Sequence, residues 1–103
     1  MNIEELEKLL EENSAKDEND DREIIKFKNN VEYGNEIGSI LSTIKGKTYE
    51  VFIHVTVEGN VYSKLLYKTF DKIEDATNYY NKIEKYIIEY NIKSIIDEIK
   101  NPK

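Results

Sequence analysis

The apolar positions near the start of the chain recur at the spacing of a helix. Asn2 can cap such a helix, and Glu5, three residues later, completes a capping-box pattern. The apolar residues that follow form one stripe, with glutamates on the opposite side; they are Ile3, Leu6, Leu9 and Leu10. This pattern predicts an amphipathic helix over about residues 3–13. Residues 13–21 are almost entirely polar, which fits either a solvated continuation of the helix or a loop.

From residue 23 onward the apolar period changes to the two-residue repeat of a strand. A first strand is expected near 23–33, before Gly34-Asn35, and its marker residues are Ile25, Phe27, Val31 and Tyr33. A second strand is expected over 37–44, followed by a turn at 45–47. Residues 48–58 are the clearest strand, because one face collects alternating apolar side chains; these are Tyr49, Val51, Ile53, Val55 and Val57.

A hairpin is expected to follow this third strand, because residues 58–60 have the composition of a tight turn. A three-residue loop there would set the register of the fourth strand, which ends near residue 70. The expected pairs are Val57 with Val61, Val55 with Ser63, Ile53 with Leu65 and Val51 with Tyr67.

A helical period returns after residue 70. Asp71, three residues before Glu74, is expected to open a helix. Its apolar stripe alternates three- and four-residue steps through Ile73, Ala76, Tyr80, Ile83, Ile87 and Tyr90. A second stripe, shifted by one residue, runs through Ile88, Ile92, Ile95 and Ile99. Asn91 is therefore the expected hinge between two helices, or a bend within one.

The order of these elements predicts an α+β fold: a four-stranded antiparallel sheet with a short N-terminal helix and one or two C-terminal helices covering one face. A length of 103 residues fits a single domain over 1–103. Within it we expect an acidic helix and polar segment (1–22), the sheet (23–70) and a helical C-terminal part (71–100).

Negative charge is concentrated at one end of the chain. Residues 1–23 carry ten carboxylates and three basic side chains, a net charge of −7, whereas the whole chain has a formal charge of −6. Residues 24–103 are therefore close to neutral. Lysine supplies every cationic side chain except Arg22, and a lone arginine disfavours direct readout of nucleic-acid bases, for which arginine is the usual residue.

Catalytic and metal-binding signatures are weak. His54 is the only histidine, and alternation along its strand points it away from the apolar row with no acid–base partner in the pattern. Asp17, Asn19 and Asp21 imitate the start of a calcium loop, but Arg22 replaces the required glycine and Lys28 the bidentate glutamate. We therefore expect no enzyme activity, no metal site and no cofactor, with a small enzyme or ligand-binding domain using His54 as the minority alternative.

The acidic segment is the leading candidate for a partner-binding site. The proposed contact residues there are Glu4, Glu5, Glu11, Glu12, Asp17, Glu18, Asp20 and Asp21. If residues 4–23 formed one helix, their carboxylates would follow one another every ~3 Å along about 30 Å, close to the 3.4 Å per phosphate of one nucleic-acid strand. The alternative is a solvated face that only aids solubility.

Tyrosines on the C-terminal helix are a second candidate. Tyr79 and Tyr86, seven residues apart, lie at the edge of the apolar stripe. They either pack at the edge of the core or contribute a protein-binding rim, because tyrosine is enriched at interfaces.

The layout resembles the small acidic inhibitors made by bacteriophages, especially anti-CRISPR proteins. The likeness covers the opening MNIEELEKLLEEN, the hairpin YEVFIHVTVEGNVYSKLLYKTF and the following helix DKIEDATNYYNKI, and includes no diagnostic motif. It implies an inhibitor, encoded by a phage or mobile element, that binds a basic nucleic-acid-handling protein or ribonucleoprotein in the host bacterium. The lack of cysteine fits a cytoplasmic protein, and the short apolar runs predict no membrane span. The single arginine disfavours nucleic acid itself as the partner. A module that homodimerises through Tyr79, Tyr86 and Ile96 is the alternative, and the pattern leaves monomer and homodimer open.

Overall fold

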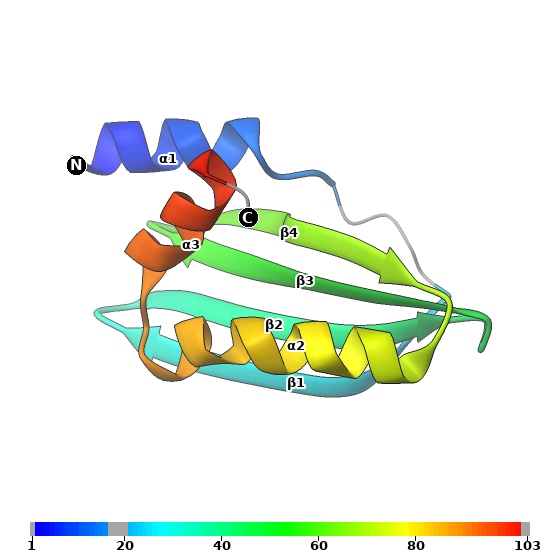
Figure 1. Cartoon of the computed structure of the whole chain (residues 1–103). Helices are drawn as coiled ribbons and strands as arrows, with labels where there is room; N and C mark the ends of the chain where they lie inside the picture. Colours follow the sequence, from blue (N-terminus) through cyan, green and yellow to red (C-terminus); the bar gives the residue numbers. More distant parts are fainter. Residues whose placement is uncertain (1, 17–20, 102–103) are drawn as a thin grey trace.

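The computed structural model describes residues 2–16 and 21–101, and it confirms the α+β layout (Figure 1). The helices are α1 (Ile3–Glu12), α2 (Ile73–Ile88) and α3 (Ile92–Lys100). The strands are β1 (Arg22–Glu32), β2 (Asn35–Ile44), β3 (Thr48–Val57) and β4 (Asn60–Phe70). These strands form one antiparallel sheet in the order β1-β2-β3-β4.

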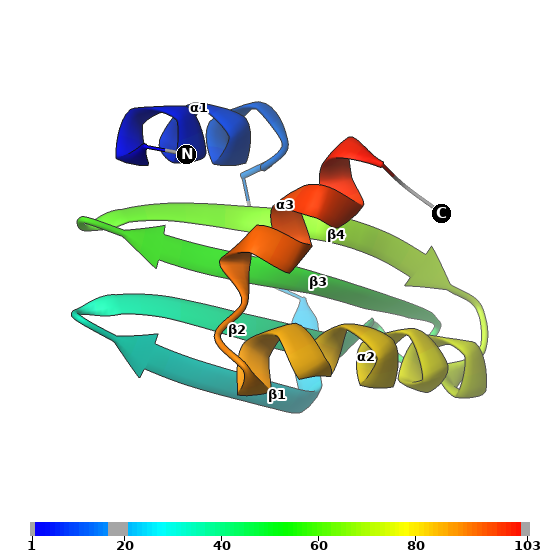
Figure 2. The ribbon, with the colours of Figure 1, turned by 60° about the vertical axis from the view of Figure 1, so that its left-hand side comes forward.

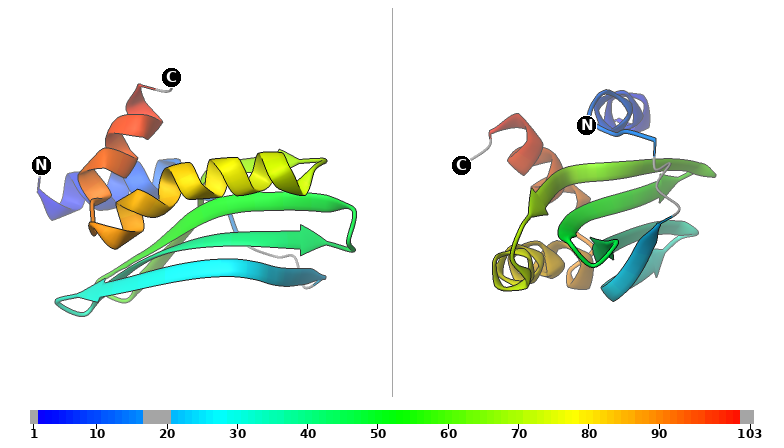
Figure 3. Two further views of the ribbon diagram at one scale, coloured as in Figure 1. Left: turned by 60° about the horizontal axis from the view of Figure 1, so that its bottom comes forward. Right: turned by 90° about the vertical axis from the view of Figure 1, so that its right-hand side faces the viewer.

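All three helices lie on the same side of the sheet (Figure 3). Helix α2 runs along β1 and β2, whereas α1 and α3 contact β4 (Figures 1 and 2). No helix of the described residues, 2–16 and 21–101, covers the opposite side of the sheet. We call this side the helix-free face. The chain reaches this face directly after α1, where the amide N–H of Ala15 donates to the carbonyl of Ser63 on β4 at 2.9 Å.

The hydrophobic core fills the space between the sheet and the helices. The predicted apolar row of β3 contributes Val51, Ile53, Val55 and Val57, each no more than 1% exposed. From the helices, the core receives Leu10, Ala76, Tyr80, Ile83, Ile87 and Ile95. Leu10 belongs to this buried cluster, so α1 is attached to the body of the protein.

The expected register of the β3–β4 hairpin is correct only at Ile53–Leu65. The loop has two residues, because Glu58 and Gly59 take φ values of 49° and 84°, as a type I′ turn requires. Val57 therefore pairs with Asn60 and Val55 with Tyr62, and Val51 pairs with Lys68 rather than Tyr67. Two bulges, each with an extra residue on β4, produce the later shifts, and Lys64 and Leu66 have positive φ there.

The helix predicted over about residues 3–13 is confirmed, because α1 spans Ile3–Glu12. Residues 14–16 are not helical and β1 begins at Arg22, which excludes the open alternative of one continuous helix over residues 4–23. The N-cap of α2 is Lys72, without a side-chain capping hydrogen bond, rather than Asp71. The hinge at Asn91 is confirmed: its side chain caps α3 by accepting a hydrogen bond from the Ser94 amide at 3.0 Å.

Candidate protein-binding surface

Helix α1 forms where the sequence predicts it, and its first turn is well capped. The Asn2 side chain accepts a hydrogen bond from the Glu5 amide at 2.8 Å, which satisfies one of the free N–H groups at the helix start. Glu4 and Glu5 lie in this first turn, where the positive end of the helix dipole stabilises carboxylates. At the other end, the Asn13 side chain donates to the carbonyl of Leu9 at 2.8 Å.

The last turn of α1 is charged against the helix dipole. Glu11 and Glu12 lie there, and the turn contains no basic residue. Carboxylates at the negative end of a helix dipole are unfavourable by a few tenths of a kcal/mol each. The positions of Glu11 and Glu12 therefore do not follow from the needs of the helix.

One side of α1 faces the body and the other faces solvent. Leu10 is fully buried, and Glu7 accepts hydrogen bonds from the Tyr62 hydroxyl at 3.4 Å and the Asn60 side chain at 3.5 Å. These contacts hold the helix against β4. The remaining glutamates are exposed; we call Glu4, Glu5, Glu11 and Glu12 the acidic helix surface. Two lysines lie nearby: Lys8 is on the same helix, and Lys100 borders a groove together with Glu5 and Glu12. The surface therefore carries both signs of charge, with more carboxylates than ammonium groups.

The rest of the predicted acidic segment does not extend this surface as a helix. Asp17, Glu18 and Asp20 lie outside the described residues. Asp21 is exposed, and its carboxylate is 3.8 Å from the ammonium of Lys45, an ion pair at the turn between β2 and β3.

Tyr79 and Tyr86 lie at the edge of the core rather than standing free of it. The Tyr79 hydroxyl donates to the carbonyl of Leu66 at 2.8 Å, and its ring lies 5.7 Å from that of Phe70. Burial is the main reason why the pKa of Tyr79 is raised to about 12. Tyr86 is only 9% exposed, and burial, followed by the nearby Glu98 carboxylate, raises its pKa. Core-edge packing thus accounts for the environment of both side chains.

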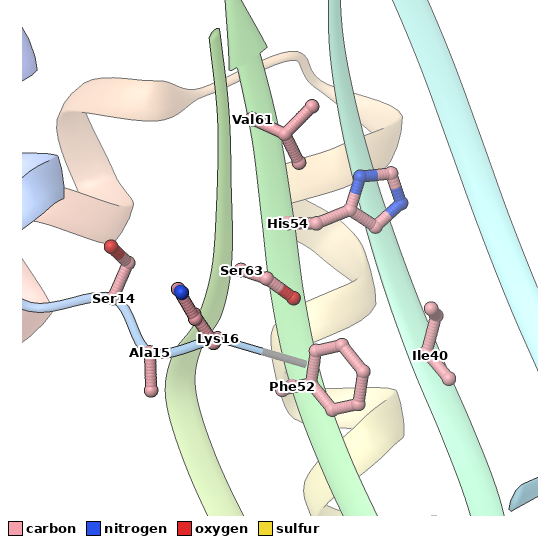
Figure 4. A pocket seen from close by; sticks show the side chains of 8 residues that line it. All are labelled: Ser14, Ala15, Lys16, Ile40, Phe52, His54, Val61 and Ser63. Carbon is pink, nitrogen blue, oxygen red and sulfur yellow. The ribbon is translucent and has the colours of Figure 1, made fainter. Parts of the chain in front are cut away.

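His54 lies on the helix-free face, as the alternation predicts. It lines a groove of about 510 Å³ together with residues 14–16 and the aromatic ring of Phe52 (Figure 4). Its Nδ1 is 4.0 Å from a Glu36 carboxylate oxygen, too far for a hydrogen bond. Burial lowers the pKa of His54, and the Glu36 charge opposes this effect. Among the described residues, no three acidic, histidine or cysteine side chains gather in a way that could hold a metal ion.

Glu50 is a buried charge that the sequence analysis missed. Its side chain is fully buried on the helix-free side of β3, where it is ion-paired with Arg22. Ser42 and Tyr67 also donate hydrogen bonds to Glu50, at 3.0 and 2.9 Å. Burial by itself would raise the pKa of Glu50, but these three hydrogen bonds and the Arg22 charge outweigh it, and the pKa is lowered. The sequence contained two signals that could have found this pair: the chain has a single arginine, Arg22, and the most apolar strand contains an acidic residue, Glu50.

Comparisons with protein families, curated proteins and solved structures found no match to this chain. No helix in the part of the chain that the structure describes is both long and apolar enough to cross a membrane.

Proposed function

We propose that this chain is a non-enzymatic inhibitor that binds a basic surface of a nucleic-acid-handling protein or ribonucleoprotein through the acidic helix surface. The observation that carries the proposal is the pair Glu11 and Glu12 in the last turn of a docked helix. These carboxylates weaken the helix that bears them. A partner that supplies positive charge at this turn would offset that cost, because opposite charges in contact attract strongly once water is excluded.

The chemistry of the surface supports a protein partner rather than nucleic acid, whose phosphates would be repelled by the same carboxylates. The four glutamates of the acidic helix surface, at positions 4, 5, 11 and 12, span about 12 Å of helix axis, an average of one charge every ~4 Å. That density is comparable with a phosphate strand. An anti-CRISPR-like inhibitor of an RNA-guided nuclease, encoded by a phage or mobile element, is the specific form that the sequence resemblance favours.

A variant that neutralises the acidic helix surface tests the proposal. Purified RNA-guided nucleases would be assayed for target-DNA cleavage with the wild-type chain and with a variant carrying four substitutions. These are Glu4→Gln, Glu5→Gln, Glu11→Gln and Glu12→Gln. We expect inhibition of at least one nuclease by the wild type, weakened by about tenfold or more in the variant. Inhibition should also fall as salt rises, because exposed charges are screened within about 8 Å at physiological ionic strength.

The matched control changes the formal charge equally at exposed glutamates elsewhere. It carries Glu23→Gln, Glu58→Gln, Glu74→Gln and Glu89→Gln. This control should inhibit as well as the wild type. Equal inhibition by the α1 variant would rule out acidic docking, and a panel of nucleases that the wild type leaves fully active would rule out the anti-CRISPR-like form.

A further inference from the structure

Strand β1 has the features of an unfinished sheet edge. It pairs with β2 on one side and has no neighbouring strand on the other among residues 2–16 and 21–101 (Figure 3). Large apolar side chains on it are exposed: Ile24 is 53%, Phe27 62% and Val31 59% exposed. A long edge strand with exposed apolar side chains is a template for pairing with another strand.

The hairpin geometry identifies which backbone groups are directed to the free edge. Strands β1 and β2 are joined by the two-residue turn Tyr33-Gly34, with φ values of 52° and 79°, and Glu32 pairs with Asn35 across it. In such a hairpin the closing pair exchanges both hydrogen bonds, and pairs alternate from there. Phe27, Asn29 and Val31 therefore direct their N–H and C=O groups away from β2.

The regular part of β1 is complementary to a reversed copy of itself. It runs from residue 26, after the bulge at Ile25, to residue 32, before the turn, and Asn29 is its midpoint. A two-fold axis at Asn29 sets Lys26 opposite Glu32 of the second copy and Phe27 opposite its Val31. Each contact occurs twice, so two ion pairs lie toward the helix side and two apolar pairs on the helix-free face.

Neighbouring registers are less complementary. An axis at Lys28 would place that lysine against its own copy, and an axis at Phe27 would place Lys26 against Lys28. Like charges directly opposite one another destabilise an antiparallel pair. An axis at Asn30 would set Lys28 opposite Glu32 of the second copy, but it shortens the overlap and loses the Phe27–Val31 pair, because the turn at Tyr33 ends the strand.

We infer that a second copy of this chain pairs antiparallel with β1 about a two-fold axis at Asn29, joining two four-stranded sheets into one continuous sheet. Helix α1 contacts β4, at the opposite edge, so both acidic helix surfaces stay at the outer ends of the dimer. The inference is independent of what α1 binds.

Single cysteines test the register, because the chain contains no cysteine of its own. In the dimer the two Asn29 Cα atoms would be about 5.5 Å apart, within the range of a disulfide. The Cα atoms of the two Lys26 residues would be offset by six residues along the paired strands, a distance of about 20 Å. Under mild oxidation, Asn29→Cys should therefore give a covalent dimer and Lys26→Cys should not. Mixing Lys26→Cys with Glu32→Cys should restore cross-linking.

Sedimentation over a concentration series tests the association itself. We expect a reversible monomer–dimer equilibrium for the wild type, with a dissociation constant raised about tenfold by Val31→Lys. Val61→Lys is the matched control, because Val61 is 67% exposed on the other edge strand, and it should leave the equilibrium unchanged. Glu32→Lys should weaken the dimer, because it sets two ammonium groups opposite each other; Lys26 is kept, because it also lies 4.0 Å from the Glu84 carboxylate of α2 in its own chain.

Circular dichroism of each variant would establish that the monomer is folded. A wild type that sediments as a monomer up to near-millimolar concentration overturns the inference. Cross-linking that is no more efficient for Asn29→Cys than for Lys26→Cys also overturns it. A dimer that Val31→Lys and Val61→Lys weaken equally would overturn it as well.

Discussion

The only arginine of the chain, Arg22, is ion-paired with the fully buried carboxylate of Glu50. The pair joins the first residue of β1 to the middle of the sheet, and the Arg22 guanidinium also lies 5.0 Å from the centre of the Phe52 ring. Removing one partner of a buried ion pair leaves the other charge without compensation. The structure therefore makes this contact the most sensitive polar interaction on the helix-free face.

Replacing Arg22 with methionine should destabilise the fold by about 3–5 kcal/mol, because Glu50 would remain buried without its main cation. Urea denaturation measures this loss. Arg22→Lys keeps the charge and should cost less. Adding Glu50→Gln to Arg22→Met should recover part of the stability, and a double variant no more stable than Arg22→Met would contradict the pairing argument.

Stability should fall in acid because of the same carboxylate. The pKa of Glu50 is lowered in the folded state, so the unfolded chain takes up its proton first as the pH falls. The stabilisation is thus complete above the ordinary glutamate pKa and is lost as the pH falls through the lowered value. Urea midpoints measured from neutral pH to about pH 3 should fall less steeply for Glu50→Gln than for the wild type. Parallel curves would show that Glu50 is not the responsible group.

Two tyrosine-to-phenylalanine substitutions should differ clearly in their effect on the free energy of unfolding. Tyr79→Phe removes the hydroxyl that donates to the Leu66 carbonyl and should cost about 1 kcal/mol of unfolding free energy. Tyr33 is 100% exposed in the turn after β1, so Tyr33→Phe should be neutral. Thermal and urea unfolding of the two variants provide the comparison, and equal stability would mean that the Tyr79 hydrogen bond contributes nothing.

A methyl group at residue 38 should be poorly tolerated. A Cβ on Gly38 would overlap the imidazole of His54 and lie 2.5 Å from the side-chain oxygen of Asn29. We expect Gly38→Ala to cost about 1–3 kcal/mol through overpacking. Adding His54→Ala removes the ring and should restore most of the stability. If the double variant stays as unstable as Gly38→Ala, the cause lies elsewhere than in the His54 ring.

Opposite ends of α1 should respond in opposite ways to the loss of a carboxylate. Glu5→Gln removes a charge that the helix dipole favours, so stability should fall by a few tenths of a kcal/mol. Glu12→Gln removes one that the dipole disfavours, so stability should rise by a similar amount. Matched denaturation curves at low salt measure both changes. A loss of stability in Glu12→Gln would undermine the view that its position works against the helix.

The sheet and the helices could be predicted from the apolar period alone, because every element except β1 turns buried side chains toward the core and β1 carries the same period on exposed ones. The two-residue turn and the bulges of β4 could not, because positive φ values at Glu58, Lys64 and Leu66 leave no mark in a hydrophobic pattern. Those shifts place Tyr67 on the helix-free face, where it bonds to Glu50. The buried network was missed for this reason: its members meet only once the register is known.

The candidate surface was predictable only in part. Exposed glutamates follow from an amphipathic pattern, and the structure agrees for Glu4, Glu5, Glu11 and Glu12. Whether the helix continued past Asn13 could not be predicted, because the polar residues there are compatible with both helix and loop; α1 ends at Glu12. The exposed apolar side chains of β1 carry the same two-residue period as a covered strand, so sequence alone does not show that this strand lies at the edge.

The strands follow one another across the sheet in chain order, with links of two or three residues at the turns. Each hairpin can therefore form without closing a long loop, which favours rapid assembly of the sheet. Helix α1 is different, because Glu7 and Tyr62 are separated by 55 positions. We expect α1 to join last during folding and to open first from the native state, so its amides should exchange hydrogen with solvent before those of β3.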